Sequence, residues 1–177
     1  MGGSPGARRA GEHPSPVVRV GTGYDSHRFD PHRPLKLGGV HFPGSPGLSG
    51  FSDGDAVGHA VIDALLGAAC LGDIGTHFPP GEEAWRDADS MELLAASVAM
   101  LRDEGWAVGN VDVTVICERP RIGPRAAEMR ARLAERMGVG AGAVSVKGKS
   151  NEAMGWIGRG EGIAVHAVAT VVRASYG

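Results

Sequence analysis

The sequence has little of several features that would place a chain of 177 residues in a specialised class. Its only two cysteines, Cys70 and Cys117, stand far apart in apolar stretches, which predicts reduced core residues and no disulfide framework. No apolar run reaches the ~20 residues that cross a bilayer, and residues 1–16 lack the apolar centre of a secretory signal. The formal net charge of −2 provides no general attraction to nucleic acid or to an anionic membrane. These absences predict a cytoplasmic protein that meets anionic ligands with local cations.

Glycine, in contrast, is abundant, at 29 of 177 residues against a usual ~7%. Most of these glycines lie among residues with apolar periodicity, which favours tight turns and close backbone approach over disorder. Residues 1–16 differ, because a segment so rich in Gly, Pro and Arg cannot bury enough surface to order itself. We therefore predict a disordered tail over residues 1–16 and a single domain over residues 17–177.

Apolar periodicity predicts an α+β domain with a mixed β-sheet and helices layered on one face. Strands are expected at residues 17–22, 35–42, 108–117, 143–147 and 162–172. Helices are expected at residues 55–71, from Ser90 onward, and at residues 124–137. We expect Ser52 or Asp53 to cap the first helix and residues 43–49 to form a turn-rich loop.

Asp25, His27 and His59 are the most informative residues, because together they offer three ligands for a divalent metal. Residues two apart in an extended segment project to the same face, so Asp25 and His27 can converge on one ion. His59 falls about one turn into the first predicted helix. Two imidazoles and one carboxylate suit zinc, and three protein ligands leave a tetrahedral ion one open position. Without the surrounding motifs, the structural interpretation is favoured, with Asp25 as a turn cap and His59 as a buried helix residue. Asp63, one turn after His59, either orients its ring or is purely structural.

Five motifs that occur in order extend this interpretation well beyond three ligands. They are Gly23-Tyr24-Asp25-Ser26-His27, Ser52-Asp53-Gly54-Asp55, Asp63-Ala64-Leu65-Leu66-Gly67, Leu71-Gly72-Asp73-Ile74-Gly75 and Gly158-Arg159-Gly160-Glu161-Gly162. With these motifs the chain resembles the 2-C-methyl-D-erythritol 2,4-cyclodiphosphate synthase family from about residue 18 to residue 172. The resemblance implies a cyclodiphosphate-synthase-like homotrimer with active sites between neighbouring subunits.

The same resemblance implies an enzyme, a phosphorus–oxygen lyase of non-mevalonate isoprenoid biosynthesis. It would convert a CDP-linked small molecule, 4-diphosphocytidyl-2-C-methyl-D-erythritol 2-phosphate, to the cyclic diphosphate and release CMP. Asp25, His27 and His59 match the ligands of one zinc ion per subunit. Glu152 matches a carboxylate that holds a second ion, magnesium or manganese, on the diphosphate, and Ser150 matches a hydroxyl residue at the phosphates. An isoprenoid ligand in the central channel of the trimer is a further implied partner.

The implied substrate-binding residues include ribose-holding, cytosine-reading and pocket-lining positions. They are Ser52, Asp73, Gly75, Phe78, Glu82, Cys117, Pro120, Arg121, Gly123, Trp156 and Arg159.

Two positions depart from the family pattern. Phe51 stands where a histidine is usual, and phenylalanine cannot donate a hydrogen bond to the transferring phosphate. Pro80 replaces a usual aspartate, although Glu82 supplies a carboxylate two positions later. As a hypothesis, Lys149, where a threonine is common, or His77 compensates for Phe51 with positive charge and has a catalytic role beside the phosphates.

Two other functions remain open from the sequence. A metal-dependent phosphohydrolase would use the same zinc to activate water, and solvent oxygen in its product would identify it. A trimeric isoprenoid-diphosphate-binding protein would use the central channel and Arg159, and the phenylalanine at position 51 would mark lost activity. Bound zinc without CMP formation would favour this binder.

Overall fold

The computed structural model describes residues 17–173, so the predicted tail at residues 1–16 lies outside the described residues. Its centre is one five-stranded sheet in the order β2-β1-β5-β3-β4. The strands are β1 Val18–Leu37, β2 Val40–Leu48, β3 Trp106–Ile116, β4 Val144–Lys149 and β5 Gly162–Arg173. The pair β3 and β4 is parallel and the other neighbours are antiparallel, which confirms the predicted mixed sheet.

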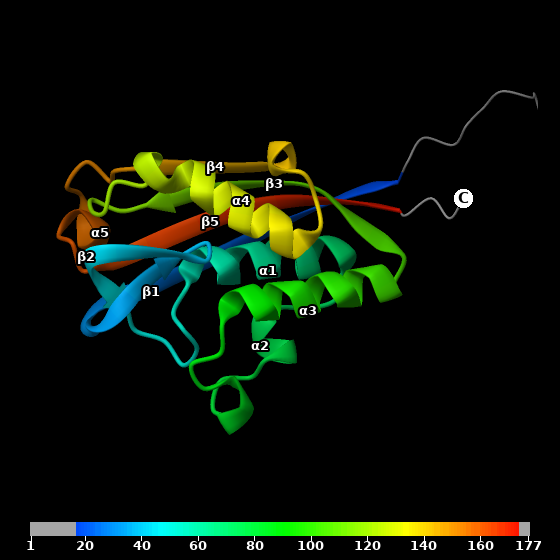
Figure 1. Cartoon of the computed structure of the whole chain (residues 1–177), viewed down its shortest axis with the longest axis horizontal. Coiled ribbons are helices and arrows are strands. Elements are labelled where there is room, and N and C mark those ends of the chain that lie inside the picture. The colour runs from blue at the N-terminus through cyan, green and yellow to red at the C-terminus, as the bar shows by residue number, and fades with distance from the viewer. Residues whose placement is uncertain (1–16, 174–177) are drawn as a thin grey trace, which may run out of the picture.

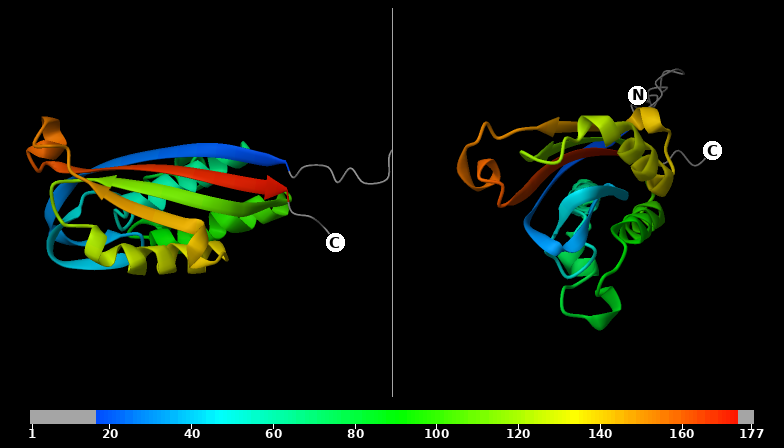
Figure 2. Two further views of the ribbon diagram at one scale, coloured as in Figure 1. Left: turned by 90° about the horizontal axis from the view of Figure 1, so that it is seen from above. Right: turned by 60° about the vertical axis from the view of Figure 1, so that its left-hand side comes forward.

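Three longer helices cover one face of this sheet (Figures 1 and 2). They are α1 Ala56–Ala69, α3 Ser90–Asp103 and α4 Ala126–Met137. Helix α1 packs on β1 and β5, α4 packs against β4, and α3 packs against α1 and α4. Two one-turn helices, α2 Ile74–His77 and α5 Gly155–Gly158, lie in the connections, together with 3-10 turns at Glu83–Trp85, Gly123–Arg125 and Ala141–Ala143. The α+β arrangement with helices on one face is therefore confirmed. None of the helices among residues 17–173 combines the length and the hydropathy needed to cross a bilayer.

Helix α1 lies unusually close to β1 because two glycines of the strand face it. A Cβ atom on Gly23 would lie 1.9 Å from the Ala60 carbonyl oxygen, and one on Gly21 would lie 2.1 Å from that of Ala64. Any larger residue would push the helix away from the strand. This close approach brings the first turn of α1, with His59, next to the middle of β1.

Asp55 ties the start of α1 to the tip of the β1–β2 hairpin. Its buried carboxylate accepts hydrogen bonds from Val57 and Gly58 in the helix and from Gly38 and Gly39 in the hairpin turn. Both turn glycines have positive φ, of 59° and 72°, a conformation that favours glycine. Asp55, rather than Ser52 or Asp53, is therefore the N-cap of α1.

The structure corrects three further expectations. Strand β1 continues past residue 22 to Leu37, because its second half pairs with β2. Residues 43–48, expected to be a loop, belong to β2; this is an edge strand whose irregular register accommodates Pro43 and Pro46. Cys70 is exposed at the left-handed C-cap of α1, whereas Cys117 is buried as predicted.

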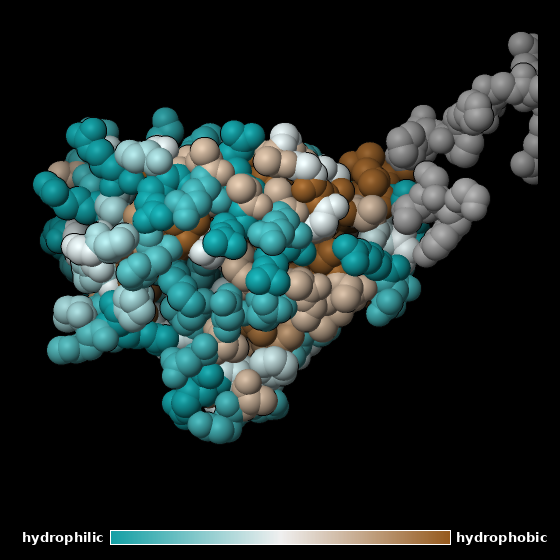
Figure 3. All heavy atoms as spheres, in the orientation of Figure 1, coloured by the Kyte–Doolittle hydropathy of each residue, from teal (hydrophilic) through white to brown (hydrophobic). Residues whose placement is uncertain are grey.

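The face of the sheet opposite the helices has no covering layer within the described chain. Val18, Val20 and Tyr24 of β1 and Val168 of β5 are exposed there. Side chains alternate between the two faces of a strand, which is why the neighbouring Ala167 and Ala169 are buried under α1 while Val168 is not. Figure 3 shows hydrophobic atoms at the end of the molecule where β1 begins and β5 ends.

Candidate metal centre and substrate pockets

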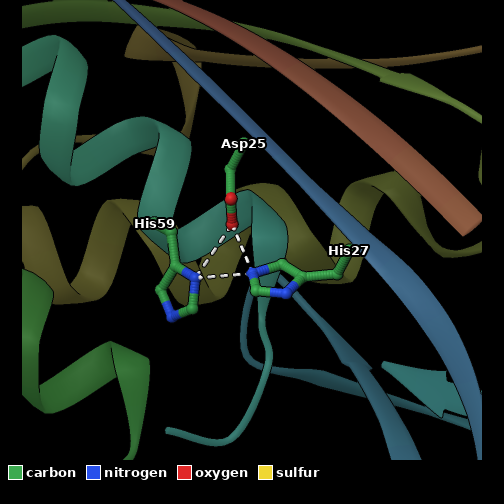
Figure 4. Close-up of side chains that lie close together, drawn as sticks. All are labelled: Asp25, His27 and His59. Carbon is green, nitrogen blue, oxygen red and sulfur yellow. Dashed lines mark hydrogen bonds and ion pairs between the residues drawn. The ribbon is translucent and has the colours of Figure 1, made fainter. Parts of the chain in front are cut away.

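Strand β1 and helix α1 bring Asp25, His27 and His59 together, as the sequence predicted. The Oδ2 atom of Asp25 lies 2.8 Å from His27 Nε2 and 2.9 Å from His59 Nδ1, and the two nitrogens are 3.3 Å apart. Figure 4 shows the three side chains turned toward a common point. We refer to these three residues as the metal group.

The electrostatics of the metal group favour a charged carboxylate and a proton on imidazole. Burial disfavours the ionised form of Asp25, but hydrogen bonds and attraction from His27 and His59 outweigh it and hold the pKa of that carboxyl well below its usual range. Burial likewise disfavours the imidazolium of His59, yet its hydrogen bond and attraction to Asp25 raise the pKa of His59. Since protons and metal ions compete for the same lone pairs, this arrangement is also suited to a cation.

The donor set passes a geometric test for a metal ion. One ligand atom from each residue lies within 4.8 Å of the other two, so a single ion can reach all three. A tetrahedral ion with bonds of about 2.0–2.1 Å places its ligand atoms ~3.3 Å apart, which the two imidazole nitrogens match. The distances to Asp25 are shorter, as expected for hydrogen bonds that a metal would replace. Two imidazoles and one carboxylate on the metal group can therefore hold a divalent ion.

The metal group opens into a pocket of about 230 Å³. Three of the residues predicted to bind substrate, Ser52, Gly75 and Phe78, line this pocket together with Asp25, His27 and His59. The other lining residues are Phe51, Ile74, Pro80, Trp85 and Leu93. We call this space the metal pocket. Both departures from the family pattern, Phe51 and Pro80, face it, so its surface is more apolar than the family pattern would make it.

The second ring nitrogen of His59 is not bonded to Asp63. The Asp63 carboxylate instead accepts a hydrogen bond from the backbone N–H of Ile74 at 2.8 Å, which is the structural alternative for this residue. His59 Nε2 lies 3.0 Å from the hydroxyls of both Ser52 and Ser90. Ser90 was identified from the sequence only as a helix start, because a serine at that position is typical of helix N-termini.

Arg33 and Arg86 hold the loop that carries Phe51 and Ser52. The Arg33 guanidinium donates to the carbonyl oxygens of Gly50 and Ser52. The Arg86 guanidinium lies 5.0 Å from the centre of the Phe51 ring, a cation–π distance. The sequence did not predict that either arginine contacts this loop, because no spacing rule connects positions 33 and 86 with residues 50–52.

A second set of predicted residues surrounds another pocket, of about 470 Å³, which we call the nucleotide pocket because the sequence resemblance implies cytosine-reading residues there. Its lining includes Cys117, Pro120, Arg121, Gly123, Lys149 and Ser150. The Cys117 thiol lies 3.4 Å from the Pro120 carbonyl oxygen, and burial raises the pKa of this thiol to about 11. Cys117 is therefore a neutral pocket wall and offers no thiolate nucleophile.

The loop after β4 gives Glu152 an unusual backbone. Glu152 and Ala153 have φ of 51° and 57°, in the left-handed region that non-glycine residues rarely adopt. The Glu118 carboxylate supports this conformation by accepting hydrogen bonds from the backbone N–H groups of Asn151 and Ala153. Glu152 itself is exposed and accepts a hydrogen bond from the Ser150 hydroxyl at 2.6 Å. Strained backbone held by neighbouring groups is frequent at functional sites.

Within one chain, the metal group and the nucleotide pocket lie far apart. Paired residues across the sheet form one row, which runs Asp25, Val165, Val115 and Gly148. Three strand spacings of about 4.8 Å separate the ends of that row by ~14 Å. Lys149 and Ser150 therefore do not join the metal group in the same chain.

The remaining predicted residues do not line either of these two pockets. Asp73 caps α2, and its carboxylate accepts from the backbone and hydroxyl of Thr76. Glu82 is exposed just before the 3-10 turn at Glu83–Trp85. Trp156 lines a third pocket that it shares with His27. Arg159 forms an ion pair with Glu161 at 2.7 Å.

Comparisons with known proteins agree with the motifs. The sequence pattern of the YgbB family matches residues 18–172. A 2-C-methyl-D-erythritol 2,4-cyclodiphosphate synthase from Gemmatimonas aurantiaca is 54% identical over 156 residues, covering 88% of this chain and 94% of that protein. The synthase from Symbiobacterium thermophilum is 53% identical, covering 86% and 97%. The chain belongs to the YgbB family. The resemblance drawn from the five motifs is thereby confirmed.

Solved structures of IspF and IspDF proteins share the fold. The bifunctional IspDF of Campylobacter jejuni superposes with a TM-score of 0.87 at 36% identity, over 90% of this chain and 43% of that one. An IspF from Plasmodium falciparum, solved as a CDP complex, gives a TM-score of 0.78 at 30% identity, over 89% and 97%. These similarities extend the family assignment to the three-dimensional arrangement of the chain.

Proposed function

We propose that this chain converts 4-diphosphocytidyl-2-C-methyl-D-erythritol 2-phosphate to 2-C-methyl-D-erythritol 2,4-cyclodiphosphate and releases CMP, in non-mevalonate isoprenoid precursor biosynthesis. The observation that carries this proposal is the convergence of Asp25, His27 and His59 at the wall of a pocket. Its context is a family whose relatives at 53–54% identity are cyclodiphosphate synthases. The cytoplasmic location inferred from the sequence stays a prediction.

We assign zinc to the metal group, because two imidazoles and one carboxylate are a common zinc set. When bound, the ion supplies positive charge and a Lewis acid for a phosphate oxygen. Asp25 contributes the negative charge that retains the cation, and the two histidines face it from either side. We assign a second ion, magnesium or manganese, to Glu152, because an exposed single carboxylate suits an ion that keeps several waters.

The chemistry explains why cationic and hydrogen-bonding groups are needed. The 2-phosphate oxygen forms a bond to the β-phosphorus of the diphosphate, and the bond from that phosphorus to CMP breaks. Each pair of unit charges brought to 4 Å costs about 4 kcal/mol at an effective dielectric of 20. Phosphoryl transfer requires mainly positioning and charge stabilisation, so no protein nucleophile is needed. Lys149 and Ser150 are suitable for the diphosphate, and the backbone of residues 117–123 for cytosine.

A homotrimer would complete this site, because the two halves of the machinery are ~14 Å apart in one chain. The exposed valines on the bare face of the sheet, Val18, Val20 and Val168, support an interface there, since such an apolar surface is rarely left open to water. Threefold packing of three such faces would enclose a channel that suits an apolar isoprenoid ligand, with Arg159 as a cation for a diphosphate end. The CDP complex of the Plasmodium falciparum relative supports the nucleotide assignment.

The decisive experiment measures CMP release from the CDP-linked substrate by the purified protein, before and after zinc removal with a chelator. We expect release of CMP with the cyclic diphosphate, loss of both on chelation, and recovery on addition of zinc. A linear product that carries oxygen from ¹⁸O-labelled water would instead identify a phosphohydrolase. Bound zinc without any CMP formation would favour a binding protein and contradict the proposed activity.

A further inference from the structure

The buried hydroxyl of Ser90 connects the metal group with a carboxylate that the proposed reaction does not use. Ser90 is the first residue of α3 and is 0% exposed. Its Oγ atom lies between His59 Nε2, at 3.0 Å, and Asp53 Oδ1, to which it is hydrogen-bonded. The other oxygen of the Asp53 carboxylate accepts from the backbone N–H of Ser90 at 3.2 Å. Lys36 Nζ, 3.6 Å from the same oxygen, completes this cluster.

The direction of these hydrogen bonds follows from what each group can donate. An ionised carboxylate only accepts, so the single hydroxyl proton of Ser90 points to Asp53. The lone pairs of the Ser90 oxygen are then left for His59, and they can only accept. His59 must therefore carry a proton on Nε2. Its Nδ1 atom faces Asp25 and His27, and Figure 4 shows the other ring nitrogen turned away from them.

Ser52 contacts the same ring nitrogen but does not set this direction. Its Oγ atom is also 3.0 Å from His59 Nε2, and Ser52 is only partly buried, on the pocket wall. A hydroxyl with no carboxylate partner can rotate either to donate or to accept. If His59 carried a proton on Nδ1 alone, the Ser52 hydroxyl could rotate to donate to Nε2. The Ser90 oxygen, whose proton points to Asp53, would instead face an unprotonated nitrogen across 3.0 Å. Ser90 therefore decides the tautomer.

We infer that Ser90, polarised by Asp53, is a positioning residue that fixes the His59 ring by accepting its Nε2 proton, so that Nδ1 points to the position of a metal ion. This inference rests on the proposed metal site. Partners of this kind, which bond the far nitrogen of a metal-binding histidine, typically change metal affinity by about 10–100-fold when they are removed. The chain thus uses a serine and a carboxylate on another element where the sequence had suggested Asp63.

The test compares Ser90→Ala with Ser97→Ala. Ser97 is a matched control, because it is also 0% exposed on α3, but its hydroxyl donates to the Leu93 carbonyl and does not reach the metal group. Zinc affinity of the metal-free proteins is measured by competition with a chromophoric chelator. We expect Ser90→Ala to weaken zinc binding about 10–100-fold and Ser97→Ala to change it less than ~2-fold. Equal affinities of the two variants would overturn the inference.

A second measurement separates positioning from folding. In ¹H–¹⁵N spectra of the imidazole rings of the metal-free protein, wild-type His59 should show a proton on Nε2 in addition to the one that Nδ1 donates to Asp25, and Ser90→Ala should weaken the Nε2 proton signal. If Ser90→Ala does not fold, Asp53→Asn replaces it in the test. Asp53→Asn keeps the Ser90 hydroxyl but removes the charge that polarises it, and it should weaken zinc binding by a smaller factor. A wild-type His59 without a proton on Nε2 would contradict the role of Ser90. Wild-type protein that binds no zinc would refute the metal site instead, while the ring spectra would still test the inference.

Discussion

The metal group and the nucleotide pocket are built from different kinds of structure. Asp25 and His27 lie on a central strand and His59 on the helix packed directly over it, with the Gly23 contact holding the two backbones together. The nucleotide pocket forms at the edge strand β4 and two loops, and its lining combines the buried Cys117 and Ile122 with exposed residues such as Arg121, Lys149 and Ser150.

The difference between the metal group and the nucleotide pocket shows which part of the site one chain can form alone. The metal group has its hydrogen bonds satisfied within the chain, including the one from His59 to Ser90. The loop with Glu152 has strained backbone supported by Glu118, but the Glu152 side chain is exposed and contacts only the Ser150 hydroxyl among the hydrogen bonds of the described chain. We therefore expect changes at the metal group to abolish activity in each subunit, and changes at the loop to act through a neighbour.

The largest effect is expected from His59→Ala, which removes one of the three proposed zinc ligands. CMP release should fall by about 10³-fold or more, because a metal ion contributes several kcal/mol to charge stabilisation. Bound zinc, measured by elemental analysis, should fall with it. His41→Ala is the control, since this exposed histidine lies outside both pockets and should keep activity and zinc. Zinc retained at the wild-type level by His59→Ala would contradict the metal group.

On the nucleotide side, Lys149→Ala should reduce turnover by about 10²-fold if its ammonium offsets the missing histidine at position 51. Zinc content should stay unchanged, because Lys149 lies in the nucleotide pocket. His77→Ala should have little effect, since the His77 ring is engaged with the Leu71 carbonyl at 2.7 Å. Unchanged turnover in both variants would refute compensation by either residue.

The close approach of α1 to β1 is tested by Gly23→Ala. The added methyl would meet the Ala60 carbonyl, so we expect a loss of about 1–3 kcal/mol in the free energy of unfolding, with weaker zinc binding. Gly140→Ala is a matched control, because a Cβ there meets no atom within 4 Å and φ is −70°. Denaturant titrations would measure both. A Gly23→Ala protein as stable as Gly140→Ala would show that this contact does not position His59.

The smallest expected effects are the pH dependences of two quantities, the stability of the metal-free protein and its affinity for zinc, which should change in opposite directions between about pH 6 and 8. The raised pKa of His59 stabilises the metal-free protein below its ordinary value of 6.5, and this contribution is lost as pH rises through the folded pKa. The lowered pKa of Asp25 contributes above its ordinary value of 3.8 and is lost only as pH falls through the folded pKa.

Zinc must displace the His59 proton, so its affinity should rise with pH, by at most about tenfold per unit for each proton displaced. Unfolding midpoints of the metal-free protein and zinc competition at several pH values from about 6 to 8 measure the two slopes. Affinity and metal-free stability that rise together would contradict the coupling between Asp25 and His59.

The sequence predicted the metal group because its two signals are local: a two-residue spacing in a strand, and a histidine in the first turn of a helix. It also predicted the three longer helices and most strands from their periodicity, but the strand expected at residues 35–42 is wrong, because the turn between β1 and β2 lies at residues 38–39. It did not predict that β1 continues to Leu37, because prolines and charged residues hide the pairing with β2. The contact from Ser90 to His59 was missed because it joins residues 31 positions apart on different helices. Such contacts depend on helix packing, which no local pattern encodes.

Mixing two inactive variants tests most directly whether the site is shared between subunits. Asp25→Asn lacks an intact metal group, and Ser150→Ala combined with Glu152→Ala lacks an intact phosphate loop. In randomly mixed trimers, one site in four would join an intact metal group to an intact loop, so we expect recovery of about a quarter of wild-type CMP release. Mixing Asp25→Asn with His59→Ala should recover nothing, because both variants damage the same half. Mixed trimers of the first pair that release no more CMP than the separate variants would contradict a site built from two subunits.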